Sequence, residues 1–168
     1  MKRLIARNDS TLADGIFSYS CTSGKGGRRP AQEKTEGDGA SPIGSWALKR
    51  VYYRPDRIAP PETKLPVSAL TPDDGWCDDP TDANYNRPVK RPYAASHEHM
   101  WRDDHAYDVV VEIAHNDDPP IPGLGSAIFI HVAHEDRRPT EGCIALALND
   151  LLEILKTADT HTHLVIEG

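Results

Sequence analysis

Residues 125–155, GSAIFIHVAHEDRRPTEGCIALALNDLLEIL, combine an apolar strand pattern with two reactive side chains. The pattern predicts a strand that ends at His131, a polar loop, a tight turn before Cys143, a second apolar segment and a helix. A strand followed by a short loop and turn can bring the imidazole and the thiol face to face. A cysteine nucleophile requires at least the thiol and an adjacent base such as histidine.

Short apolar runs predict strands over much of the remaining chain. The predicted strands are residues 2–7 and 16–21, paired as a hairpin, 46–53, 67–70, 106–114 and 126–132, paired as neighbours, and 163–167. One short helix is predicted at 150–157, with Asn149 as its N-cap. We therefore expect a mainly β domain, either a sandwich or a barrel, with one or two short helices.

The chain has the length of one domain, and no internal repeat or second domain is visible in residues 1–168. Residues 54–105 are rich in proline, which excludes long helices and central strands there. They also contain aromatic side chains such as Trp76 and Trp101, which disordered segments usually lack. We expect this proline-rich segment to be an ordered insertion or lid over a groove.

Charge and hydropathy exclude several classes of protein. The formal net charge of −7 argues against a nucleic-acid partner, which requires a basic surface. No apolar run approaches the roughly 20 residues of a transmembrane helix. Residues 1–15, MKRLIARNDSTLADG, lack the apolar core and cleavage site of a secretory signal. The protein is then cytoplasmic, or its signal lies outside this sequence, or its export takes another route.

The three cysteines match no zinc-binding spacing, because there is no Cys-x-x-Cys. Cys21 and Cys77 form either a disulfide or two buried free thiols, and the sequence leaves both alternatives open. The histidine pairs at 97–99 and 161–163 offer too few ligands for a tight metal site. We predict no metal site.

Two segments of the chain resemble the YkuD-type L,D-transpeptidase catalytic domain. Thr140-Glu141-Gly142-Cys143-Ile144, after His131, is similar to the family signature of a histidine, a loop and Ser/Thr-His-Gly-Cys. Residues 36–46, EGDGASPIGSW, resemble the glycine-rich segment at the start of the family domain. The resemblance covers residues 36–46 and 106–167 and is weak or absent over 54–100.

The resemblance implies a β-sandwich-like fold and an acyl-enzyme formed between a cysteine and a peptidoglycan stem peptide. Cys143 is then the nucleophile, and His131 is the general base and acid. Gly142 shapes the turn, so that the N–H groups of Gly142 and Cys143 are natural oxyanion donors. The family implies no metal or organic cofactor. It also implies a location in the periplasm or cell envelope, and we expect a monomer.

Three departures from the family pattern concern the substrate. Glu141 replaces the usual histidine, Ala145 replaces an arginine or asparagine, and the loop after His131 is shorter than usual. These changes are expected to remove a cation near the substrate and add an anion, so we predict an altered substrate choice, such as an atypical stem-peptide position. Further candidate substrate contacts are Thr140, Trp101 and His105, with His97 and His99 as candidate lid residues.

Two other functions remain open from the sequence. A hydrolase of the same fold (a carboxypeptidase, endopeptidase or amidase) would keep the chemistry and use water as the acceptor. A non-catalytic peptidoglycan-binding module would need neither Cys143 nor His131, so their presence at this spacing argues against it.

Overall fold

The computed structural model describes residues 1–168 and consists mainly of short strands, with one α-helix. The strands are β1 (Arg3–Ala6), β2 (Thr11–Ala13), β3 (Ser18–Thr22), β4 (Arg28–Pro30), β5 (Ser41–Tyr53), β6 (Val67–Ala69), β7 (Asp74–Cys77), β8 (Pro88–Lys90), β9 (His97–His99), β10 (Val109–Ile113), β11 (Phe129–Val132), β12 (Ile144–Leu146) and β13 (His163–Ile166). The helices are the 3-10 helix η1 (Ala31–Glu33) and α1 (Leu148–Leu155). The expected mainly β class is confirmed.

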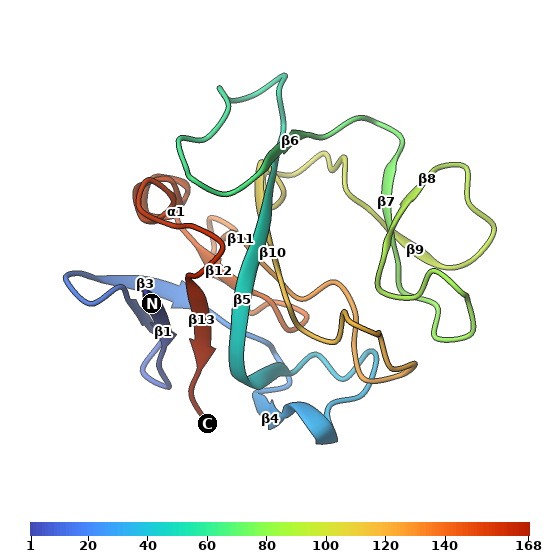
Figure 1. The fold of residues 1–168 in the computed structure, drawn as a ribbon, viewed down its shortest axis with the longest axis horizontal. Helices are drawn as coiled ribbons and strands as arrows, with labels where there is room; N and C mark the ends of the chain where they lie inside the picture. Colours follow the sequence, from blue (N-terminus) through green and yellow to red (C-terminus); the bar gives the residue numbers. More distant parts are fainter.

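The main sheet closes on itself through the long strand β5. Its strand order is β10-β11-β12-β3-β2-β1-β13-β5, and β5 pairs again with β10. The first part of β5 pairs with β13, and its last part pairs with β10. Figure 1 shows β5, in cyan, crossing the centre of the molecule between the N-terminal strands and the proline-rich segment. The closed path makes the architecture barrel-like.

Strands β10 and β11 are buried on both faces. Because side chains alternate along a strand, Val109 lies in the barrel core and Val110 in a second core outside the barrel. The same alternation on β11 turns Ile130 into the barrel and Phe129 into the outer core. His131 therefore shares the outer face of β11 with Phe129.

The outer core is built from the proline-rich segment. Strand β7 pairs with β8 and β9 in a small antiparallel sheet, which lies to one side of the barrel (Figure 1). From this sheet, the buried Trp76 packs edge-on against Phe129, with ring centroids 4.9 Å apart. The segment 54–105 is therefore ordered and covers the outer face of β10 and β11. Its assignment as an insertion or lid stays a prediction.

The expected N-terminal hairpin is wrong. The strand β2 lies between the two predicted partners, so β1 pairs with β2 and β13, while β3 pairs with β2 and β12. Two aspartates make two turns where we expected one. The Asp9 carboxylate accepts from Thr11, and the Asp14 carboxylate accepts from the N–H groups of Ile16 and Phe17. Such side-chain turns are typical of aspartate.

The predicted N-cap of the helix is also wrong. Helix α1 begins at Leu148, so Asn149 lies within its first turn, and the N-cap Ala147 makes no side-chain hydrogen bond. No side chain caps the start of this helix. Burial of Leu151, Ile154 and Leu155 against the barrel stabilises it instead. No helix of the structure has the length and hydropathy required to cross a membrane.

All three cysteines are buried and free. Of the two alternatives for Cys21 and Cys77, the structure therefore has two separate thiols. They lie on β3 and β7, which belong to different sheets.

Asn86 joins the covering segment to the barrel. Its side-chain oxygen accepts from Trp76 Nε1 at 2.9 Å and from the Ala127 N–H at 3.0 Å. Its side-chain nitrogen donates to the carbonyl groups of His115 and Asn116 at 3.2 and 2.7 Å. One buried side chain thus makes four hydrogen bonds and satisfies four polar groups of other residues.

We predict that Asn86→Ala lowers the free energy of unfolding by about 3 kcal/mol or more, because several polar groups lose their partner inside the protein. Urea unfolding followed by tryptophan fluorescence measures the change. The control is Asn84→Ala, whose side chain is exposed and donates only to the Tyr93 hydroxyl. Equal stability of the two variants would contradict this role of Asn86.

Candidate active site

Cys143 and His131 line one cavity of about 620 Å³ between the barrel and the covering segment. The barrel side of the wall comes from the end of β11 and the turn before β12. The opposite side comes from residues after β7 and around β9, including Asp78, Glu98 and Arg102. The two residues that the sequence predicts as catalytic thus share one space.

The turn before Cys143 depends on a close backbone contact. Gly142 has a φ of +133°, and a Cβ at this position would lie 2.8 Å from the Ala40 carbonyl oxygen. The buried Ser41 hydroxyl donates to the Gly142 carbonyl at 2.7 Å and accepts from the Gly24 N–H at 2.9 Å. The two segments that carry the sequence resemblance therefore meet at this glycine, which explains why the position requires one.

The Cys143 thiol is held by backbone groups of the β11 segment. It donates to the Ala127 carbonyl at 3.3 Å, and its sulfur accepts from the Phe129 N–H at 3.3 Å. Burial, together with the nearby Glu98 carboxylate, raises the pKa of Cys143 to about 12. The resting side chain is therefore a neutral thiol at neutral pH.

His131 is held as a neutral imidazole with one free nitrogen. Its Nδ1 lies 2.9 Å from the Val132 carbonyl oxygen, and a carbonyl only accepts, so Nδ1 carries the proton. Nε2 is then the basic nitrogen. Burial lowers the pKa of His131 to about 4, against a smaller opposing effect of the hydrogen bond to Val132. At neutral pH the ring can accept a proton but does not already carry a charge.

The expected pair of oxyanion donors is half wrong. The Gly142 N–H donates to the Thr140 hydroxyl at 3.1 Å and is not free for a substrate. The Cys143 N–H makes no hydrogen bond within the protein. The Thr140 hydroxyl also donates to the Cys143 carbonyl at 2.6 Å, so it closes the turn on both sides. Of the two expected donors, the Cys143 N–H is thus the one that remains free.

The predicted substrate contacts are only partly at the cavity. Thr140 and Glu141 line it, but Trp101 and His105 do not. Trp101 lies against the Arg54 guanidinium, 3.7 Å from its carbon to the ring centroid. His105 pairs with the Asp108 carboxylate at 2.7 Å. The prediction that these two side chains contact substrate beside Cys143 is therefore not supported by their positions.

The predicted lid histidines also lie away from the cavity wall. His97 and His99 stack on each other, with ring centroids 5.4 Å apart, and neither lines the cavity. Between them, Glu98 does line it, because alternate residues of β9 face opposite sides. No group of three or more histidine, cysteine, aspartate or glutamate side chains is arranged to hold a metal ion.

The sequence predicted that the substrate site loses a positive charge and gains a negative charge through Ala145 and Glu141. Basic residues from other segments offset this change of charge. The Glu141 carboxylate lies 2.7 Å from Lys25 Nζ, and both side chains are largely exposed. Ala145 is fully buried in β12, opposite His131 in the strand register. Basic residues from other segments line the same cavity, namely Lys25, Lys34, Arg102 and Arg138.

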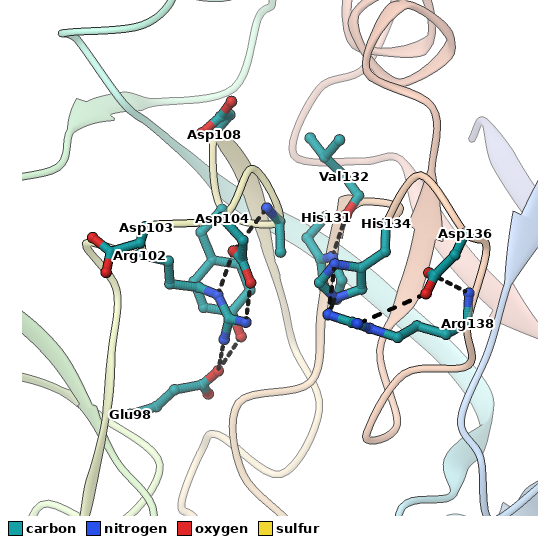
Figure 2. Close-up of polar contacts among 12 residues, drawn as sticks. Glu98, Arg102, Asp103, Asp104, Asp108, His131, Val132, His134, Asp136 and Arg138 are labelled. Carbon is teal, nitrogen blue, oxygen red and sulfur yellow. Dashed lines mark hydrogen bonds and ion pairs between the residues drawn. The ribbon is translucent and has the colours of Figure 1, made fainter.

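Sequence reasoning missed a polar network that Figure 2 shows beside His131. Arg102 makes a two-point contact with Asp104, at 2.8 and 2.6 Å, and its Nη1 lies 3.9 Å from Glu98. The Tyr107 hydroxyl donates to Glu98, and the Tyr107 ring lies edge-on to His131 at 5.4 Å between centroids. The available signal was the dense charge of residues 98–104, next to the valine-rich strand.

We predict that iodoacetamide at pH 7 labels Cys143 before Cys21 and Cys77, because Cys143 lines the cavity and has a base nearby. Labelling stays slower than that of free cysteine, because the thiolate is the reactive form and the pKa of Cys143 is raised. Peptide mapping by mass spectrometry measures the order. His131→Asn should abolish the preference, and equal labelling of the three thiols in the unchanged protein would contradict the assignment.

A comparison with family models matches residues 2–166 to YkuD, the L,D-transpeptidase catalytic domain. Searches of curated proteins and of solved structures found no match. The matched region includes the whole barrel, the covering segment and every residue of the cavity. The chain therefore belongs to the YkuD family of L,D-transpeptidase catalytic domains.

Proposed function

We propose that this protein is a peptidoglycan L,D-transpeptidase that forms an acyl-enzyme on Cys143 and transfers the acyl group to an amine of another stem peptide. The observation that carries this proposal is the neutral Cys143 thiol and the neutral His131 imidazole in one cavity. The family acts on peptidoglycan, so we expect the protein to work in the cell envelope, and we expect a monomer.

In the first half-reaction, His131 Nε2 takes the thiol proton as the sulfur attacks a stem-peptide carbonyl carbon. The C–S bond forms, and the carbonyl oxygen gains negative charge, toward which the free Cys143 N–H can donate. The C–N bond then breaks, and His131 returns its proton to the leaving amine. A neutral Cys143 thiol and a neutral His131 imidazole suit this mechanism, because proton transfer and attack on the carbonyl occur together and no thiolate has to form beforehand.

In the second half-reaction, an amine replaces the leaving group at the thioester carbon. The new C–N bond forms, the C–S bond breaks, and Cys143 regains its proton through His131. Water in place of the amine would give hydrolysis, which is the alternative of a peptidoglycan hydrolase. Glu141 with its partner Lys25 lies at the cavity wall. These are the side chains that we expect to favour an atypical stem position.

The assay uses purified protein and disaccharide-peptide monomers from peptidoglycan. We predict dimers, and Cys143→Ala should abolish them because it removes the nucleophile. Liquid chromatography with tandem mass spectrometry identifies both the amount and the linked positions. Trimmed monomers without dimers would favour the hydrolase, and activity that survives Cys143→Ala would refute the catalytic assignment. Dimers with only the family-typical 3→3 link would contradict an atypical stem position.

The pH dependence of acylation tests the role of His131. The base must be neutral to take the thiol proton, and burial lowers its pKa to about 4. Acylation should therefore persist as the pH falls to about 5 and be lost as it falls through about 4. Rapid-quench intact-mass measurement of the acyl-enzyme gives the rate. A loss centred near pH 6.5, the ordinary histidine value, would contradict a buried neutral base.

A further inference from the structure

Glu98 places an incompletely satisfied carboxylate in the wall of the Cys143 cavity. Its side chain is 28% exposed and therefore only partly buried. Oxygen Oε1 accepts from the Tyr107 hydroxyl and lies 3.9 Å from Arg102 Nη1. Oxygen Oε2 has no hydrogen bond within the protein. One face of this carboxylate is therefore available to a ligand that donates hydrogen bonds.

Tyr107 ties Glu98 to the reacting pair. The tyrosine is buried, and its ring lies edge-on to both His131 and Phe129 at 5.4 and 6.0 Å between centroids. The Glu98 charge also raises the pKa of the Cys143 thiol, which places the carboxylate within electrostatic reach of the sulfur. The Glu98 charge would therefore also act on a thioester formed at Cys143.

Transfer to an amine releases a proton that Cys143 and His131 cannot hold. An aliphatic amine has a pKa of about 10 and arrives as an ammonium. Its nitrogen loses two protons as the C–N bond forms and the C–S bond breaks. One of them restores the Cys143 thiol by way of His131. The second needs another acceptor, because the imidazole must return to its neutral form for the next turnover.

We propose, resting on the transpeptidase function above, that Glu98 binds the ammonium group of the acyl acceptor and takes this second proton. Glu98 is then a catalytic residue of the transfer half-reaction, and its partial exposure lets it pass the proton to solvent. Tyr107 is a positioning residue that holds the carboxylate toward the cavity. A second wall carboxylate, Asp78, has a buried oxygen without a hydrogen-bond partner and adds to the attraction for a cation.

The charged surroundings of Glu98 suit this role. Burial raises the pKa of Glu98 to about 7, while the Tyr107 hydrogen bond and Arg102 oppose the rise. The charges of Asp78, which follows β7, and of Glu36, which precedes β5, contribute to this rise. A carboxylate with such a pKa is a more effective base near neutral pH than an ordinary glutamate.

The test separates the two half-reactions in the full-length protein, with disaccharide-peptide monomers as donor and acceptor. We expect Glu98→Gln to lower dimer formation at pH 7.5 by roughly 100-fold, the usual contribution of a general base. Formation of the acyl-enzyme should not slow, because removal of the charge lowers the pKa of the Cys143 thiol. The deficit should shrink as the pH rises and free amine becomes available. The matched control is Glu62→Gln, an exposed glutamate outside the cavity.

The outcomes are distinguishable. Absence of an acyl-enzyme in the unchanged protein would overturn the proposed function, and this inference with it. A normal acyl-enzyme, together with unchanged transfer and unchanged pH dependence in Glu98→Gln, would overturn this inference alone.

A second variant, Tyr107→Phe, tests the inference independently, in case Glu98→Gln does not fold. Tyr107→Phe keeps the carboxylate and the ring but removes the hydrogen bond that lowers the pKa of Glu98. The midpoint of the pH dependence of transfer should therefore move upward, while acylation keeps its low-pH limit. An unmoved midpoint would contradict the inference.

Discussion

The burial of β10 and β11 on both faces is the constraint on which this structure depends. A strand with two apolar faces needs two cores, and a closed barrel supplies only one of them. The second core comes from Trp76, Met100 and their neighbours in the covering segment. The cavity lies at the edge of this second core, beside Cys143 and near the end of β11 at His131. A feature required for packing thus also creates the walls of the candidate site.

The chemistry follows from the same burial. A low-dielectric setting disfavours the charged form of any isolated group, so the thiol and the imidazole are both neutral. Backbone groups of Ala127 and Phe129 orient the sulfur, and the Val132 carbonyl selects the histidine tautomer. Orientation therefore comes from main-chain atoms, which tolerate changes of side chain at these positions.

The sequence predicted best those features that arise from local pattern. The strands around Val110 and Ile130 were predicted as neighbours, because long apolar runs with β-branched residues leave few alternatives. The strand β2 was missed, since three residues between two aspartate turns carry little periodic signal. Cys143 and His131 share one cavity because they are close in sequence: His131 lies on β11, and Cys143 directly precedes β12, the parallel neighbour of β11.

Glu98 was missed for a different reason. Its position in the wall of the Cys143 cavity depends on how a proline-rich segment folds back over the barrel, and such a segment has no period from which a face can be assigned. The same limit applies to Trp101 and His105, which the sequence placed near the cavity. Only the tertiary structure shows that Arg54 and Asp108 hold these two side chains elsewhere.

The burial of the Cys143 thiol among main-chain groups has a consequence for its oxidation. Oxidants such as peroxides attack the thiolate, and a reactive cysteine outside the reducing cytosol is exposed to sulfenic acid formation and mixed disulfides. With its pKa raised to about 12, the resting Cys143 is almost entirely protonated. In the proposed mechanism, its sulfur gains nucleophilic character only when a substrate carbonyl is in place and His131 removes the proton. Under that mechanism, burial protects the proposed nucleophile from oxidation between turnovers and still allows it to react when substrate is bound.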